Sequence, residues 1–201
     1  MTKVLQQSAK VRTNGTPDSI CKIEIESVKF AGLWNGYPKT STPYRDPKTG
    51  EVPKIYENQC AIRVSMSIHS VGITMKSFKG ASLTLEGKKV AIRAQELADW
   101  LKLMPFCGLP TKPETITGSE WQKKIAGRTG ILFFQDYWSR DGEQSTATGD
   151  HIDLWNGSKM TAASFTGAMH SFLRFTLGID RLEGIYSDLG KSKQILFWEV
   201  K

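Results

Sequence analysis

Apolar segments of strand length in the second half of the chain constrain the fold more than any other feature. The longest, TGILFFQDYW at 129–138, has the nearly continuous apolar content of a strand that is buried on both faces. DHIDLW at 150–155 and QILFWEV at 194–200 are shorter but similar in character. We therefore expect these segments to be strands of a sheet.

Helices are predicted around these strands. AIRAQELADWLKLM at 91–104 repeats its apolar residues every three or four positions, and SEWQKKIAG at 119–127 predicts a shorter helix with Ser119 as N-cap. FTGAMHSFLRFTLG at 165–178 also has helical spacing, and we expect it to lie across the strands. Mixed helices and strands in a chain of 201 residues predict one α+β domain over 1–201.

The first part of the chain has weaker patterns. Residues 1–19 are polar and predict a loosely held tail, whereas ICKIEIESVKF at 20–30 alternates as a half-exposed strand or a short helix would. NGYPKTSTPYRDPKTGEVPK at 35–54 contains four prolines and predicts a long loop. Long loops in compact domains often carry function, so this loop is expected to border a site.

Composition limits the partners of the chain. Lysine and arginine exceed aspartate and glutamate by 27 to 20, which gives a net charge of +7. These basic residues are scattered, so they indicate a mildly basic surface and no nucleic-acid partner. No segment has the about 18 apolar residues of a membrane span, and no apolar signal segment opens the chain. We expect a protein that is made in the cytoplasm without a signal peptide and does not insert into membranes.

The cysteines are too few and too far apart for a structural framework. Cys21, Cys60 and Cys107 form neither a disulfide pattern nor a CxxC metal motif, so we expect no metal and no other cofactor. Cys21 and Cys107 could pair, but nothing in the sequence decides it. A lone cysteine is usually a small buried hydrophobe, whereas a catalytic cysteine requires a base nearby.

The segment after Cys60, AIRVSMSIHSV at 61–71, fits two periods. Strict alternation of apolar and polar residues predicts a strand. Ala61, Val64 and Ile68 also fall on one helical stripe, which predicts a helix. Periodicity leaves both structures open.

The histidines differ in their surroundings. His69 and His170 lie in segments compatible with helices and are expected at the surface or in packing. His151 instead opens a strand that ends at Asn156-Gly157, the strongest short hairpin signal.

A two-residue loop at 156–157 would determine which residues of the hairpin face each other. It places Ala162 opposite His151. Asp153 lies two residues along on the same face, about 6.8 Å from His151, and Ser164 lies diagonally across. Either Asp153 or Ser164 could orient the imidazole, although Asp153 could also simply cap a polar strand face.

QCAIRVSMSI, TGILFFQDYW and GDHIDLWNG, in this order, resemble the type VI secretion amidase effectors of family four. The resemblance covers residues 55–160. Members of this family are cysteine amidases with a papain-like fold of the NlpC/P60 kind. The resemblance therefore implies an α+β domain in which a nucleophile helix, here the segment after Cys60, packs on an antiparallel sheet.

The same resemblance implies the roles of individual residues. Cys60 matches the nucleophile, and His151 matches the general base. An acid often stands in the family at the position of Ala162 in this chain, so the third member departs from the pattern. We expect Asp153 to replace it.

Other residues near Cys60 are candidates for the substrate site. The backbone N–H of Cys60 is the expected oxyanion donor, with Gln59 or Tyr56 as a second. Trp138 and Trp155 could wall the substrate groove, although aromatic residues of strands more often belong to the core.

The resemblance also implies a substrate and partners. The family cleaves the peptide stem of bacterial peptidoglycan between D-glutamate and diaminopimelate, as an antibacterial toxin delivered by type VI secretion into the periplasm of a target cell. A cognate immunity protein would block the cleft. Two alternatives remain: a cysteine hydrolase of another amide bond, and a non-enzymatic basic binding module in which Cys60 is a packing residue.

Overall fold

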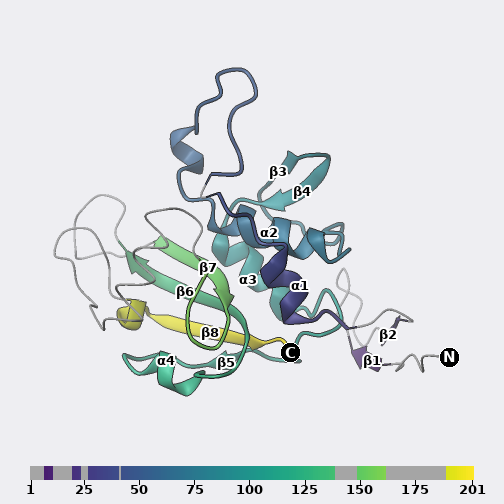
Figure 1. Ribbon diagram of the computed structural model, residues 1–201, viewed down its shortest axis with the longest axis vertical. Helices are drawn as coiled ribbons and strands as arrows, with labels where there is room; N and C mark the ends of the chain where they lie inside the picture. Colours follow the sequence, from purple (N-terminus) through teal and green to yellow (C-terminus); the bar gives the residue numbers. More distant parts are fainter. Residues whose placement is uncertain (1–6, 11–19, 24–26, 41, 139–148, 162–188) are drawn as a thin grey trace.

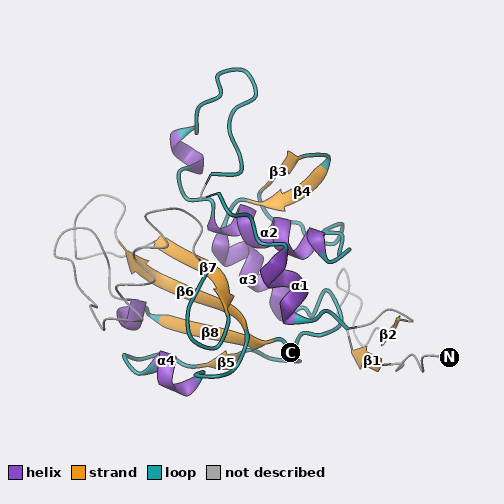
Figure 2. Ribbon diagram, viewed as in Figure 1, coloured by secondary structure: helices purple, strands orange, loops and turns teal. Residues whose placement is uncertain are grey.

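Helices pack on one face of an antiparallel sheet in the computed structural model (Figure 1). These helices are α1 (Phe30–Asn35), α2 (Cys60–Ser70) and α3 (Ala94–Lys102), and Figure 2 shows them together beside the strands. The predicted α+β class, with a helix on an antiparallel sheet, is confirmed. The residues that the structure describes are 7–10, 20–23, 27–40, 42–138, 149–161 and 189–201.

The segments predicted as strands form this sheet, together with a short additional strand. β6 (Gly130–Trp138) lies between β7 (Gly149–Trp155) and β8 (Gln194–Glu199), and β5 (Glu114–Thr115) pairs with β8. All of these pairings are antiparallel. Within the described residues, the order β5-β8-β6-β7 makes β7 an edge strand. α2 packs against β7.

The burial of β6 on both faces explains its continuous apolar sequence. Alternate residues of β6 pack with the helices, while Leu132 and Phe134 belong to a second cluster on the opposite face. Residues from α4 (Trp121–Lys124) and η2 (Leu189–Lys191) complete this second cluster. The sheet thus separates two apolar cores.

The predicted N-cap of α4 is wrong by one residue. Glu120 is the N-cap, and its side chain makes no capping hydrogen bond. The N–H of Trp121 donates to the carbonyl of Gly118 at 3.2 Å, so a turn precedes the helix and Ser119 lies inside that turn.

α2 follows the helical period rather than the alternating one. The serines that suggested alternation are buried and hydrogen-bonded. The Ser65 hydroxyl donates to the Ala61 carbonyl at 2.8 Å and accepts from the Ala91 N–H at 3.0 Å. The Ser67 hydroxyl donates to the Leu33 carbonyl of α1 at 2.6 Å. Because their hydroxyls have partners, these serines are tolerated inside the core, and their polarity gives no information on exposure.

The first part of the chain differs from the prediction. β1 (Gln7–Lys10) pairs with β2 (Ile20–Ile23), so the predicted tail contains a strand. The alternating segment at 20–30 holds β2 and the start of α1 rather than one element. The predicted loop at 35–54 follows α1, projects at the top of Figure 1 and leads into η1 (Lys54–Tyr56).

The remaining described elements form a small hairpin. β3 (Ser82–Leu85) pairs with β4 (Lys88–Ala91), next to α2. The helix predicted at 165–178 lies outside the described residues. Among the helices that are described, none has the length and apolar content needed to cross a membrane.

Candidate active site

Cys60 is the first residue of α2. N–H groups in the first turn of a helix have no partner within the helix, and the helix dipole places partial positive charge there. This position favours an anion such as a thiolate. Cys60 is buried, with 4% of its surface exposed.

His151 of β7 lies against Cys60. The thiol hydrogen-bonds with the imidazole, and the backbone N–H of Ile152 donates to the same sulfur. The His151 side chain is 17% exposed, and its ring centre lies 6.2 Å from that of Phe134. The structure therefore brings the two predicted residues together, with the imidazole as the member nearer to solvent.

Each member of this pair shifts the pKa of the other. Burial raises the pKa of the Cys60 thiol, but the hydrogen bond and charge of His151, with the charge of Arg63, lower it below its ordinary value. Burial lowers the pKa of His151, but Asp153 and Cys60 raise it to about 9. Both shifts favour a thiolate beside an imidazolium.

Asp153 lies beside the same imidazole. Its Oδ2 is 3.6 Å from His151 Nε2, which is a charge contact rather than a short hydrogen bond. Its Oδ1 accepts a hydrogen bond from the Leu154 N–H at 2.8 Å and another from the Thr161 hydroxyl. The buried carboxylate is thus held through one oxygen while the other faces the histidine.

The hairpin after β7 is longer than predicted. Trp155 pairs with Met160, so the loop spans 156–159. The side chain of Asn156 explains the length, because its Oδ1 accepts hydrogen bonds from two backbone N–H groups of the loop, at 3.1 and 2.9 Å. The predicted two-residue loop is therefore wrong, and the facing residues shift by two.

The corrected register changes which residues lie near the carboxylate. Thr161, which had no predicted role, supplies the hydroxyl that binds Asp153. Ala162 and Ser164 lie outside the described residues. The predicted position of Ala162 opposite His151 does not follow from the observed loop, and the alternative role of Ser164 stays a prediction.

A buried tyrosine and an arginine complete the surroundings of Asp153. Tyr37 follows α1 and is 7% exposed, while Arg63 lies on α2 one turn after Cys60. The guanidinium carbon of Arg63 is 6.0 Å from the centre of the Tyr37 ring. Burial raises the pKa of Tyr37, and the charge of Asp153 raises it further. No pattern in the sequence predicted a role for either residue.

Gln59 and Tyr56 hold the preceding loop. Gln59 is buried, and its Oε1 accepts from the Tyr44 N–H while its Nε2 donates to the Tyr44 carbonyl, both at 2.8 Å. The Tyr56 ring meets the Tyr44 ring edge to face, with centres 5.1 Å apart. The Gln59 amide anchors the loop beside the start of α2, which argues against its predicted role as an oxyanion donor.

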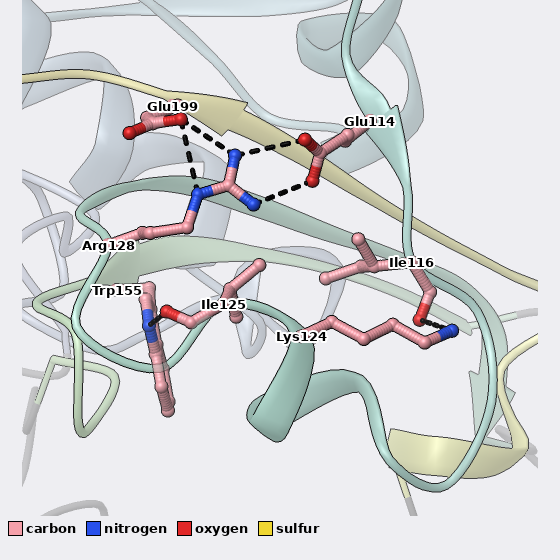
Figure 3. Close-up of polar contacts among 7 residues, drawn as sticks. All are labelled: Glu114, Ile116, Lys124, Ile125, Arg128, Trp155 and Glu199. Atoms are coloured by element: carbon pink, nitrogen blue, oxygen red, sulfur yellow. Dashed lines mark hydrogen bonds and ion pairs between the residues drawn. The ribbon is translucent and has the colours of Figure 1, made fainter.

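Trp155 is a core residue rather than a wall of the groove. Its Nε1 donates to the Ile125 carbonyl at 3.0 Å, as Figure 3 shows, and its ring centre lies 5.4 Å from that of Trp121. It is buried in the second apolar cluster. The backbone of Trp138 pairs with Gly149, but its side chain lies outside the described ones.

Of the other candidate residues, His69 is described and lies away from this site. His69 Nε2 lies 2.7 Å from the Lys89 carbonyl, at the end of α2 remote from Cys60, so His69 has a packing role as predicted. His170 lies outside the described residues, as does the side chain of Cys21. Within the described part of the chain, no group of three or more His, Cys, Asp and Glu residues could hold a metal ion.

The model of one protein family covers α2 and the strands of the main sheet. The family described as type VI secretion system (T6SS) amidase effector protein 4, Tae4, matches residues 56–198. This chain belongs to the Tae4 family. It is therefore an amidase effector of the type VI secretion system. The match includes Cys60, His151 and Asp153.

Solved structures of Tae4 have the same fold. Tae4 of Salmonella typhimurium, solved with the immunity protein Tai4, is 17% identical, covers 86% of this chain and 98% of its own, and has a TM-score of 0.56. Tae4 of Enterobacter cloacae is 19% identical, covers 86% of this chain and 96% of its own, and has a TM-score of 0.52. Among curated proteins, none matches this chain in sequence.

Proposed function

We propose that this Tae4 protein is a cysteine amidase with Cys60 as nucleophile and His151 as general base and acid. The observation that carries the proposal is the contact of thiol and imidazole at the start of α2. An amide carbonyl is a poor electrophile, so its hydrolysis requires a thiolate rather than a thiol. The helix N-terminus and the neighbouring imidazolium both stabilise a thiolate.

The reaction would proceed in two stages. The Cys60 thiolate attacks the amide carbonyl, and the resulting oxyanion faces the backbone N–H of Cys60 in the first turn of α2. Imidazolium His151 gives its proton to the departing amine, which leaves a thioester. Neutral His151 then removes a proton from water, and the hydroxide released by this step hydrolyses the thioester.

Asp153 is the proposed third member. Its carboxylate faces Nε2 of His151, so Nδ1 is the ring nitrogen left for the thiol. A negative charge beside Nε2 stabilises the imidazolium and keeps the ring in one orientation. The hydrogen bonds from Leu154 and Thr161 to Oδ1 hold the carboxylate in place for this role.

The proposed substrate is the peptide stem of peptidoglycan, cut at the bond between D-glutamate and diaminopimelate. Its support is membership of an amidase effector family, together with a net charge of +7 that suits an anionic wall polymer. The enzyme would have a papain-like arrangement and act in the periplasm of the target cell. Its partner would be an immunity protein, because relatives are solved in complex with Tai4.

Digestion of purified sacculi tests the proposal. The wild-type protein should release fragments whose masses correspond to cleavage after D-glutamate, and Cys60→Ser should release none. Intact sacculi together with cleavage of a protein substrate would instead favour a hydrolase of another amide bond. Intact sacculi and no cleaved amide would favour the binding module.

A further inference from the structure

The catalytic pair and its acid place unbalanced charge inside the protein. In the reactive state, Cys60 and Asp153 are both anions, while His151 carries one positive charge. Cys60 and Asp153 are buried, and burial of net charge is costly unless another charge compensates it. A further cation nearby would stabilise this state.

Arg63 occupies the place where such a cation is needed. It follows Cys60 by three residues on α2, and residues at this spacing lie on the same side of a helix. Its backbone N–H donates to the Gln59 carbonyl at 2.9 Å, so it belongs to the first full turn of the helix. The charge of Arg63 contributes to the lowered pKa of the Cys60 thiol, and the charges of Tyr37, Asp153 and Cys60 in turn raise the pKa of Arg63.

The guanidinium of Arg63 packs against an aromatic ring. It lies over the ring of Tyr37, with 6.0 Å between the guanidinium carbon and the ring centre. The position of Tyr37 depends on the preceding residue, Gly36. Any other residue there would have a β-carbon within 1.7 Å of the Ser70 hydroxyl oxygen. α1 can therefore end directly against α2 only because a glycine stands at this position, and the next residue carries the ring beneath Arg63.

We propose that Arg63 is a positioning residue whose permanent positive charge offsets the negative charges of the Cys60 thiolate and the Asp153 carboxylate around His151. Arg63 acts through these side chains and does not itself touch the substrate. The inference rests on the proposed function, because it assigns a role within the same site. It also predicts that the positive charge at this position matters more than the shape of the side chain.

The other charged groups around α2 do not supply this charge. Lys88 and Lys89 of β4 lie near the opposite end of the helix, where His69 contacts the Lys89 carbonyl. The charged side chains of α3 pair with each other or with the residues just before that helix. Among the described residues, His151, Arg63 and the Ile152 N–H affect the pKa of the thiol, and Tyr37, Asp153 and Cys60 affect that of Arg63.

The test measures alkylation of Cys60 by iodoacetamide between pH 5 and 10, followed on the Cys60 peptide by mass spectrometry. Arg63→Gln should slow alkylation at pH 6 about tenfold, because loss of a nearby opposite charge moves a pKa by about one unit or more. Arg63→Lys should stay within about threefold of wild type, because it keeps the charge. Arg128→Gln is the matched control and should alkylate as wild type does.

The outcomes separate this inference from the proposed function. If wild-type Cys60 alkylates with the pH profile of a model thiol, the proposed function fails. If wild-type Cys60 is activated and folded Arg63→Gln has the same profile, only the role of Arg63 is overturned. If Arg63→Gln does not fold, Arg63→Lys decides: a profile like wild type supports the role, and a profile like a model thiol rejects it.

Discussion

Two arginines, Arg63 and Arg128, have similar neighbours but different roles. The guanidinium carbon of Arg63 lies 6.0 Å from the centre of the Tyr37 ring, and the charge of Asp153 contributes to the raised pKa of Arg63. Arg128 lies 5.1 Å from the ring of Phe197 and bonds to carboxylates as well. Each arginine thus combines an aromatic ring with acidic neighbours, one beside the candidate site and one at the far side of the sheet.

The neighbours of Arg128 are two glutamates that lie outside the candidate site. Figure 3 shows its guanidinium between two glutamates: it donates to Glu114 at 2.8 and 3.0 Å and to Glu199 at 2.7 and 3.2 Å. These bonds tie β5, β8 and the start of β6 together, and the side chain is 30% exposed. Such a partly exposed network stabilises the fold modestly.

The neighbours of Arg63 include groups that change charge during catalysis. Its charge contributes to the lowered pKa of the Cys60 thiol, and this thiol hydrogen-bonds with a histidine whose pKa is raised to about 9. Arg63 and Arg128 have similar types of neighbour, so their roles differ because of burial and because the neighbours of Arg63 change charge during catalysis. We therefore expect changes near Arg63 to alter rates and changes near Arg128 to alter stability.

The largest effect should come from removal of the nucleophile. Cys60→Ala should reduce release of stem-peptide fragments at least about 10⁴-fold, because the remaining groups cannot form the thioester. The variant should still fold and melt cooperatively, since the volume lost is small. Fragment release by mass spectrometry and a thermal melt measure the two quantities. Activity within tenfold of wild type would remove Cys60 from the mechanism.

A smaller loss is expected for the acid. Asp153→Asn should reduce kcat/KM by about 10²- to 10⁴-fold. The His151 imidazolium would lose the negative charge that stabilises it, and the ring would lose the group that orients it. The variant keeps the shape of the side chain, and steady-state rates on a soluble stem peptide measure the loss. A loss of less than about threefold would mean that another group orients His151.

The pH dependence should be bell-shaped, with tenfold changes per pH unit on its limbs. Protonation of the thiolate removes the nucleophile, so kcat/KM falls on the acid side below the lowered pKa of Cys60. Loss of the imidazolium proton removes the acid for the leaving amine, so kcat/KM falls above the His151 pKa of about 9. A basic limb near pH 6.5 would contradict the raised pKa.

The same shifts determine how stability varies with pH. The raised pKa of His151 contributes stability that is fully present below its ordinary value of 6.5 and is lost as pH rises through about 9. The lowered pKa of Cys60 contributes stability that is present above its ordinary value of 9.0 and is lost as pH falls through the folded value. Thermal melts across this range, compared with Cys60→Ala, report both contributions.

The smallest effect on rate should come from the structural arginine. Arg128→Gln should leave kcat/KM within about twofold and lower the free energy of unfolding by about 1 kcal/mol, the range of partly exposed ion pairs. Urea denaturation and rates at 25 °C measure the two quantities. A rate loss comparable to that of Arg63→Gln would remove the distinction between the two clusters.

Much of the fold could be predicted because its signals are local. The strands at 129–138 and 194–200 are apolar on both faces, and the helix at 91–104 has an unbroken stripe. The hairpin register was predicted wrongly because Asn156-Gly157 indicates a two-residue loop, while the Asn156 side chain binds two further backbone groups and lengthens it. Such a bond competes with the turn preference and leaves no separate pattern in the sequence.

The candidate site was predicted only in part. Cys60 and His151 carry family motifs, and Asp153 shares a strand face with His151, so local reasoning reaches all three. Arg63 could have been found from its spacing of three residues after Cys60 on a helix. Tyr37 could not, because it reaches the site through the packing of α1 on α2, a contact between segments that no local period encodes.

Titration of His151 tests the central claim most directly, namely that the Cys60 thiolate and the His151 imidazolium form an ion pair. The imidazole signal, assigned by comparison with His151→Gln, can be followed by NMR in wild type and in Cys60→Ala. We predict a pKa of about 9 in wild type and a clear fall toward 6.5 when the Cys60 sulfur is removed. A wild-type pKa near 6.5, unchanged in Cys60→Ala, would contradict the account.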